Sequence, residues 1–242
     1  MRNLGAALLI ASLGVALAQD YARPPGGLEA PPDFPPSYQV HISPSGMTNP
    51  GASTTGGNYW VARGWQIRNM IAEAWNVEES RLDILAPADL TRRYDFAMVL
   101  PRPEERDTIY AYVRRAIEDQ FHLRIGFELQ SKDVYVLTAP GGMLPAVRIL
   151  PRADNGSIAS SLNLTDHSVS AREVSMAQFC SLLERLLNSL VIDETHIDGR
   201  MDIDVQGEGR GRAALIAMLR DHVGLVLTPG RRDVQMLVIR GE

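Results

Sequence analysis

The sequence is poor in residues that stabilise secreted proteins or recruit nucleic acid. It contains one cysteine in 242 residues, which excludes an intramolecular disulfide. Aromatic residues make up 6% of the chain and the formal net charge is -5, so neither a base-stacking platform nor a basic field is present. We therefore expect no nucleic-acid partner. The single cysteine, Cys180, follows Phe179 in a helical pattern and is interpreted as a small buried side chain in preference to a nucleophile.

Long apolar runs are also scarce, and the one that stands out lies at the N-terminus. Arg2 supplies a positive charge, residues 4–17 are apolar, and Ala16-Leu17-Ala18 before Gln19 has the form of a signal-peptidase site. The run is short and rich in Ala and Gly for a membrane span. We therefore expect residues 1–18 to be a signal peptide. The mature protein would be periplasmic or secreted, with no membrane span.

Motifs of the common enzyme classes are missing as well. The sequence has no G-x-S-x-G elbow, and its Gly-rich stretch at 207–211 lacks the lysine and the strand–helix context of a phosphate-binding loop. Its five histidines show no ligand spacing such as H-x-x-x-H. The sequence therefore predicts no catalytic residue, no metal site and no cofactor.

The patterns that are present alternate between helix and strand. Residues 19–37 are rich in proline and predict a linker. An apolar stripe with helical spacing runs from Ile67 to Trp75, and a second one runs from Phe179 to Leu187. Because water cannot satisfy such a stripe, each must be buried against a sheet. We expect helices over both stretches, with Ser175 as the N-cap of the second.

Polar residues recur in the same order in the two halves of the chain. Arg93-Tyr94-Asp95-Phe96 matches Arg200-Met201-Asp202-Ile203, and 119–123 matches 221–225. This recurrence predicts a duplicated unit with shorter loops in the second copy. The expected fold class is α+β, with two pseudo-repeated lobes. Each lobe would be a small mixed β-sheet with two helices packed on one face.

The predicted boundaries follow from this repeat. The first lobe would span 38–139, a connection 140–168, and the second lobe 169–242. Turn-forming residues predict that each lobe ends in a hairpin, formed by 123–129 with 134–139 and by 225–227 with 234–239. The segment 191–205 is interpreted as two strands with a tight connection.

An acidic segment around this connection is the first candidate site. It holds Asp193, Thr195, His196, Asp198 and Asp202, and closely spaced oxygen ligands can bind a hard cation. However, the spacing does not match a calcium loop, and strand alternation leaves Asp202 on a polar face. We therefore favour a solvated face with turn-capping carboxylates over a metal site.

Three aromatic residues form the second candidate site. Tyr59, Trp60 and Trp65 cluster before the first helix, beside a Gly-rich loop. Exposed rings at such a place can bind a sugar or a partner surface. The alternative, which we favour, is that they fasten the helix to the sheet.

The chain resembles a family of secreted soil-bacterial proteins, best known from acidobacteria and defined as a domain of unknown function. The resemblance covers residues 38–242 and is most specific over 191–202, where the family usually has Gly at the position of His196 and an aromatic residue at that of Met201. A Gly there would allow a positive φ, so His196 is expected either to adopt an uncommon backbone conformation or to mark a different turn. In element order, each half is also similar to the small N-terminal domains of secretins and TonB-dependent receptors, which are docking modules.

These observations lead to two functional hypotheses. The favoured one is an exported, non-enzymatic interaction module that docks on an envelope or extracellular protein, or on a glycan, with exposed sheet edges available for strand addition. The alternative is an exported hydrolase or ligand-sensing domain that uses the region of Asp193, His196 and Asp202. A pocket gathering these three side chains would favour the alternative.

Overall fold

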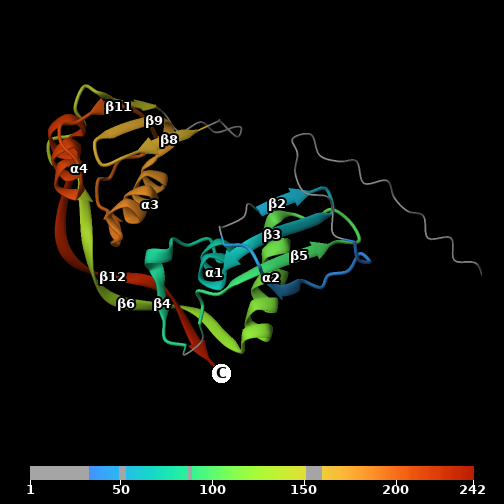
Figure 1. The fold of residues 1–242 in the computed structure, drawn as a ribbon. Helices are drawn as coiled ribbons and strands as arrows, with labels where there is room; N and C mark the ends of the chain where they lie inside the picture. Colours follow the sequence, from blue (N-terminus) through green and yellow to red (C-terminus); the bar gives the residue numbers. More distant parts are fainter. Residues whose placement is uncertain (1–32, 49–52, 87–88, 151–159) are drawn as a thin grey trace, which may run out of the picture.

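A computed structural model describes residues 33–48, 53–86, 89–150 and 160–242 of the chain. The predicted signal peptide and residues 19–32 of the predicted linker lie outside the described residues. The described chain combines helices with three four-stranded sheets, so the α+β class is confirmed. Figure 1 shows two bodies of helix and sheet connected by a long two-stranded ribbon.

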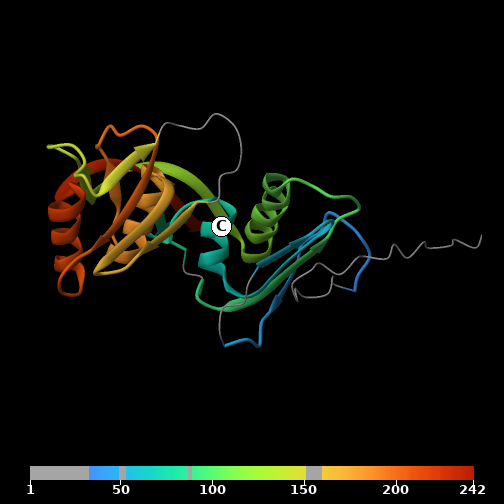
Figure 2. The same ribbon diagram turned by 90° about the horizontal axis from the view of Figure 1, so that it is seen from above.

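The first body is an antiparallel sheet covered by two helices. Its strand order is β1-β5-β3-β2. Helices α1 and α2 lie on the same side of this sheet (Figure 2), and their apolar stripes pack on Trp60, Phe96 and Met98. The bounds of these elements are β1 His41–Pro44, β2 Ser53–Gly56, β3 Tyr59–Gln66, α1 Ile67–Ala74, β5 Arg93–Val99 and α2 Arg106–Phe121.

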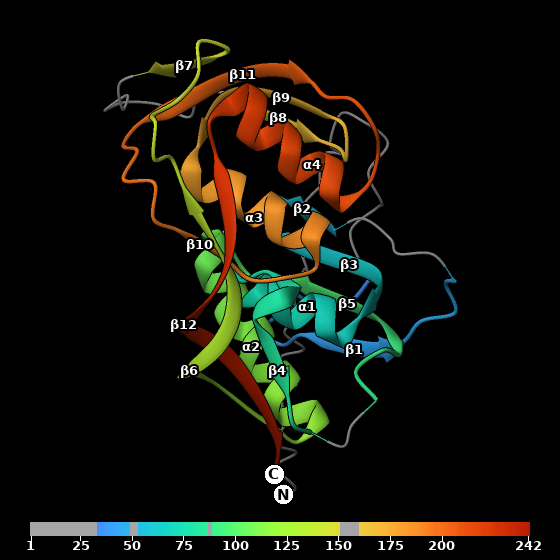
Figure 3. The same cartoon turned by 90° about the vertical axis from the view of Figure 1, so that its left-hand side faces the viewer.

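The second body has the same construction. Its antiparallel sheet has the order β7-β11-β9-β8, and α3 and α4 pack beneath it (Figure 3). Phe179, Leu183, Met201 and Ile203 lie in the shared core. The bounds are β7 Val147–Leu150, β8 Ser161–Leu164, β9 Ser168–Ser175, α3 Met176–Leu187, β11 Arg200–Gln206 and α4 Arg212–Met218, which a π-turn extends over Leu219–Val223.

A third, mixed sheet joins the two bodies. Its order is β10-β6-β12-β4, and it takes two strands from residues 38–139 and two from residues 169–242. Strands β6 and β12 pair antiparallel over their full length, whereas β10 pairs parallel to β6 and β4 parallel to β12. The mixed pairing therefore lies between the bodies, and the sheet within each body is antiparallel. The bounds are β4 Leu82–Ile84, β6 Leu123–Thr138, β10 Val191–Asp193 and β12 Val226–Gly241.

The two predicted terminal hairpins are wrong. β6 and β12 are each one continuous strand of 16 residues, running from the pair Leu123↔Gly241 to the pair Thr138↔Val226. Polar residues at 130–133 and Pro229-Gly230 resemble turns, but here they sit in an exposed two-stranded ribbon where water can reach them. The segment 191–205 contains two strands as predicted, β10 and β11, and they belong to different sheets.

Local geometry recurs in the two bodies. In β3, Arg63 and Gly64 bulge opposite Asp95, and in β9, Arg172 and Glu173 bulge opposite Asp202. Gly64 and Glu173 both have positive φ, at 64° and 50°. The capping residue after α2 is His122 and the one after the π-turn is Gly224, both also left-handed.

Candidate functional site

The acidic segment is spread along the surface and is occupied by local hydrogen bonds. Asp193, exposed at the end of β10, accepts hydrogen bonds from the backbone N–H of Thr195 at 2.9 Å and from its hydroxyl at 2.7 Å. Glu194 forms two hydrogen bonds with Arg232, at 2.7 and 3.1 Å, and this contact lowers the pKa of the Glu194 carboxyl. These are turn-capping and surface pairing roles.

The connection between β10 and β11 has an unusual backbone. His196 has φ of 56°, so of the two expected alternatives it adopts the uncommon backbone conformation. Gly199 has φ of 108°, and a Cβ there would lie 2.5 Å from the carbonyl oxygen of Leu150. His196 and Asp198 are both exposed. Backbone constraints therefore explain why this stretch is distinctive.

Asp202 has a structural partner of its own. Its Oδ1 accepts a hydrogen bond from the backbone N–H of Glu173 at 2.8 Å, and Arg172 lies 3.9 Å from its Oδ2. Asp202 and Asp193 belong to different sheets. Within the described ranges, no group of three or more His, Cys, Asp and Glu side chains is placed to hold a metal ion.

Two residues of the aromatic candidate are buried. Tyr59 and Trp60 have 4% and 2% exposure, and Trp60 packs against Phe96 and Tyr110. The Trp60 ring lies between the sheet and its helices, whereas Tyr59 packs with Val61 and Val99 on the opposite face of the sheet. Neither buried ring offers a face to a sugar or a partner. Trp65 is half-buried and lines a polar cleft of about 480 Å³ between the two bodies.

A buried ion pair holds the bodies together beside this cleft. Glu184 of α3 is 1% exposed and accepts hydrogen bonds from Arg81 at 2.6 and 3.2 Å and from Ser80 at 2.9 Å. It also accepts the backbone N–H of Val191 at 3.0 Å. A buried carboxylate with this many donors is a fixed structural joint.

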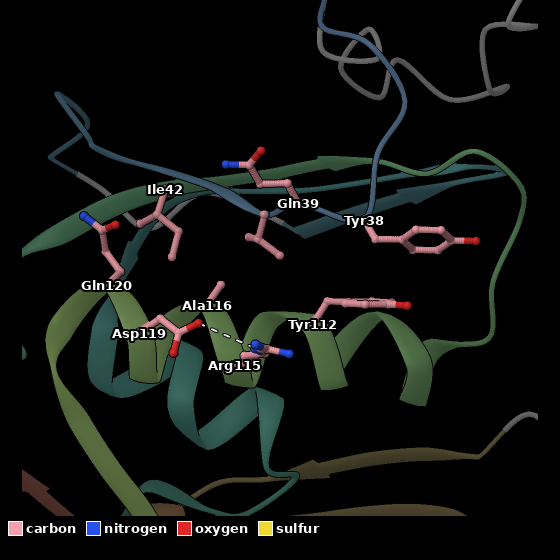
Figure 4. A pocket seen from close by; sticks show the side chains of 9 residues that line it. Tyr38, Gln39, Ile42, Tyr112, Arg115, Ala116, Asp119 and Gln120 are labelled. Atoms are coloured by element: carbon pink, nitrogen blue, oxygen red, sulfur yellow. Dashed lines mark ion pairs between the residues drawn. The ribbon is translucent and has the colours of Figure 1, made fainter.

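A second groove, of about 420 Å³, lies between α2 and the chain leading into β1. Figure 4 shows the rings of Tyr38 and Tyr112 facing each other at one end and the Arg115–Asp119 ion pair along the helix side. The ring centroids are 5.1 Å apart, and the Tyr38 hydroxyl donates to Glu104 at 3.2 Å. One face of each ring is thus covered by the other ring.

A further candidate binding feature is the outer edge of β6. Tyr135 donates its N–H to Leu190, and the Leu137 carbonyl accepts from Glu194, so odd-numbered residues of β6 direct their backbone groups away from β12. The β6–β12 register has no shift, so Phe127 and Leu129 point their N–H and C=O groups the same way. In the part of the chain that the structure describes, β10 covers this edge only at 135–137.

The side chains on this edge are apolar and exposed. Phe127 is 48% exposed and Leu129 is 71% exposed. The edge is bounded at one end by Glu118, which accepts the backbone N–H of Ile125 at 3.3 Å, and at the other end by β10. An exposed edge with apolar side chains is a template for pairing with another strand.

The corresponding edge of β12 is protected. Tyr135 and Leu237 hold equivalent places, because each begins the parallel pairing with a short strand. When residues are counted back from Tyr135 in β6 and from Leu237 in β12, Phe127 corresponds to Pro229 and Leu129 corresponds to Arg231. Proline has no N–H to offer and a charged side chain discourages pairing. The ribbon therefore has one blocked edge and one open edge.

Sequence reasoning missed the site on β6. The available signal was the alternation Ile125, Phe127, Leu129 among polar residues, which indicates a strand with one apolar side. The predicted hairpin ended this strand at Leu129, so a continuous strand with one long outer edge from 123 to 138 was not expected.

Comparison with known proteins gives a family match. The family model described as "Protein of unknown function (DUF3738)" matches residues 68–241. The chain belongs to this family. No curated protein and no solved structure matches it. Among the residues that the structure describes, no helix has the length and apolar character needed to cross a membrane.

Proposed function

We propose that this protein is an exported, non-enzymatic interaction module that docks on an envelope or extracellular protein by strand addition at β6. The observation that carries the proposal is the open edge at Phe127 and Leu129. Its backbone groups point outward, its side chains are exposed and apolar, and the equivalent edge of β12 is blocked by Pro229 and Arg231. Main-chain hydrogen bonds would supply affinity, and the two side chains would select the partner strand.

The proposal includes duplication of one unit. The order strand, helix, strand, strand, helix, strand occurs twice, as β3 to β6 and as β9 to β12. The two bulges and their Asp partners support this origin. In a duplicated protein, residues of contrasting chemistry at equivalent edges indicate that the two copies have taken different roles. The β12 edge stays exposed to solvent without pairing, and the β6 edge binds a partner strand.

Export is part of the same proposal and rests on the N-terminal pattern. Cleavage after Ala18 would give a mature chain that begins at Gln19. Mass spectrometry of the protein recovered from periplasm or culture medium should find an N-terminal peptide starting at Gln19. Retention of residues 1–18 in cytosolic protein would overturn this part.

A charge and a proline on β6 test the docking site. The double variant Phe127→Pro/Leu129→Arg copies onto β6 the residues that β12 carries at the equivalent positions. Because the N–H of Phe127 points away from β12, proline there removes no hydrogen bond of the ribbon, so the variant should fold. Arg231→Ala on β12 is the matched control, since it changes the other edge and removes only the exposed contacts of Arg231 with Ser131 and Asp133.

The measurement is binding of an envelope or extracellular protein captured by the wild type and then purified. We expect the double variant to weaken its affinity at least about tenfold, and Arg231→Ala to leave it unchanged. Circular dichroism confirms that all proteins are folded. Equal affinity of the folded double variant would refute docking at β6.

A further inference from the structure

The open edge of β6 is complementary to itself. The strand has an apolar series that is similar in both directions, formed by Ile125, Phe127 and Leu129. Between and beside these residues, Arg124 and Glu128 carry opposite charges. Two copies of the strand can therefore face each other antiparallel without placing like charges opposite. Unprotected edges of this kind are usually covered in native proteins.

We propose that two copies of the protein pair their β6 strands about a two-fold axis at Phe127, which closes the docking edge until a partner strand displaces the second copy. This inference rests on the proposed function and adds a regulation of the same site. The dimer would extend the ribbon into a continuous sheet through both subunits.

The register follows from side-chain chemistry. With the axis at Phe127, the two Phe127 residues face each other and Ile125 lies opposite the partner's Leu129. Glu128 then lies opposite the partner's Gly126 and diagonal to the partner's Arg124 and the partner's Glu128, and Arg240 of the same chain pairs with each Glu128 carboxylate. Aromatic and aliphatic cross-strand pairs and diagonal opposite charges favour pairing.

Neighbouring registers are poorer. An axis at Glu128 places the two Glu128 carboxylates opposite each other and Arg124 opposite the partner's Lys132. An axis at Leu129 places Ile125 opposite the partner's Asp133. Like charges directly opposite destabilise a sheet, and an apolar side chain gains nothing beside a carboxylate.

Backbone geometry favours the same register. Phe127 and the partner's Phe127 would exchange two N–H to C=O hydrogen bonds, and the Leu129 N–H would donate to the free carbonyl of the partner's Ile125. Leu123, where β6 begins, would lie opposite the partner's Ser131. The partner's β10, which pairs with Tyr135 and the next two residues, would lie beyond that end of the strand.

Single cysteines read the register directly. Phe127→Cys, Glu128→Cys and Leu129→Cys each form a disulfide with their own copy only when the axis passes through that residue, because bridged Cα atoms lie about 4.4–6.8 Å apart. Copper–phenanthroline serves as the oxidant. The native Cys180 is buried, so the wild type is the background control.

We expect Phe127→Cys to form covalent dimers at least about tenfold faster than the other two variants. We also expect a concentration-dependent dimer of the wild type in analytical ultracentrifugation, which Phe127→Pro/Leu129→Arg abolishes. A strictly monomeric wild type, or equal cross-linking of all three variants, would overturn the inference. If the wild type is monomeric while the double variant still loses the partner, the dimer fails and the proposed function stands. If the dimer forms and the double variant keeps the partner, the proposed function fails.

Discussion

Asp202 on β11 accepts a 2.8 Å hydrogen bond from the backbone N–H of Glu173 on β9, across a β-bulge. Asp95 makes the same bond with Gly64, also at 2.8 Å, in the other body. In both places an arginine, Arg200 or Arg93, donates to the carbonyl of the bulged residue, at 3.0 and 2.6 Å. The Arg-x-Asp pattern in the sequence thus specifies a bulge, and the geometry assigns Asp202 a structural task.

Removal of the Asp202 carboxylate should destabilise the fold. Asp202→Ala leaves the Glu173 N–H without its acceptor, and we expect the free energy of unfolding to fall by about 1–3 kcal/mol. Asp95→Ala should have a similar effect in the other body. Urea denaturation of both variants measures it. An unchanged midpoint for both would contradict the assigned role.

Glycine at position 173 should stabilise the protein. Glu173 has φ of 50°, a conformation that costs an L-residue about 1–2 kcal/mol, whereas Gly64 occupies the equivalent bulge without that strain. After the greater entropy of glycine in the unfolded chain is subtracted, Glu173→Gly should gain about 0.5–1 kcal/mol. Gly64→Ala is the reciprocal control and should lose stability. A destabilised Glu173→Gly would show that the Glu173 side chain contributes more than its backbone costs.

The joint between the two bodies should be sensitive to Glu184. Glu184→Gln leaves the Arg81 guanidinium without its carboxylate at a mostly buried site, which should cost about 3 kcal/mol. Arg115→Ala, which removes a solvent-exposed pair with Asp119, is the control and should change stability by less than about 0.5 kcal/mol. Thermal unfolding monitored by two probes would compare them. Equal effects would argue against a structural joint at Glu184.

The thiol of Cys180 should be inert in the folded protein. Burial, reinforced by the charges of Asp193 and Glu184, raises the pKa of this thiol to about 12. Because the thiolate is the reactive form, alkylation by iodoacetamide at pH 8 should be slow until the protein unfolds. Since the folded pKa lies above the unfolded value, about 8.5, stability should decline as pH rises through this interval. Rapid labelling of native protein at pH 8 would contradict the burial.

Local patterns in the sequence were sufficient to predict much of the fold. The apolar stripe from Ile67 lies in α1, and Ser175 caps α3 through a capping box with Gln178. These features depend on side chains within a few residues of one another. They can therefore be predicted from a single sequence.

The ribbon and the site on β6 could not be predicted in this way. Leu123 pairs with Gly241 and Thr138 with Val226, so the contacts that define β6 lie far away along the chain. Gln130 to Asp133 have turn-like chemistry, and no local signal distinguishes a turn from an exposed strand that pairs at long range. The acidic segment has an unusual sequence because its backbone has positive φ at His196 and Gly199. A single sequence does not distinguish such a backbone requirement from a functional one.

Residue-resolved amide hydrogen exchange along β6 tests the open edge most directly. In dilute protein, the outward-facing amides of Phe127 and Leu129 should exchange fast, and those of Gly126 and Glu128, which face β12, should be protected. Addition of the purified partner, or of more protein, should protect Phe127 and Leu129 selectively. Exchange at these two amides that stays fast in the bound state, while the partner protects another surface, would contradict docking by strand addition at β6.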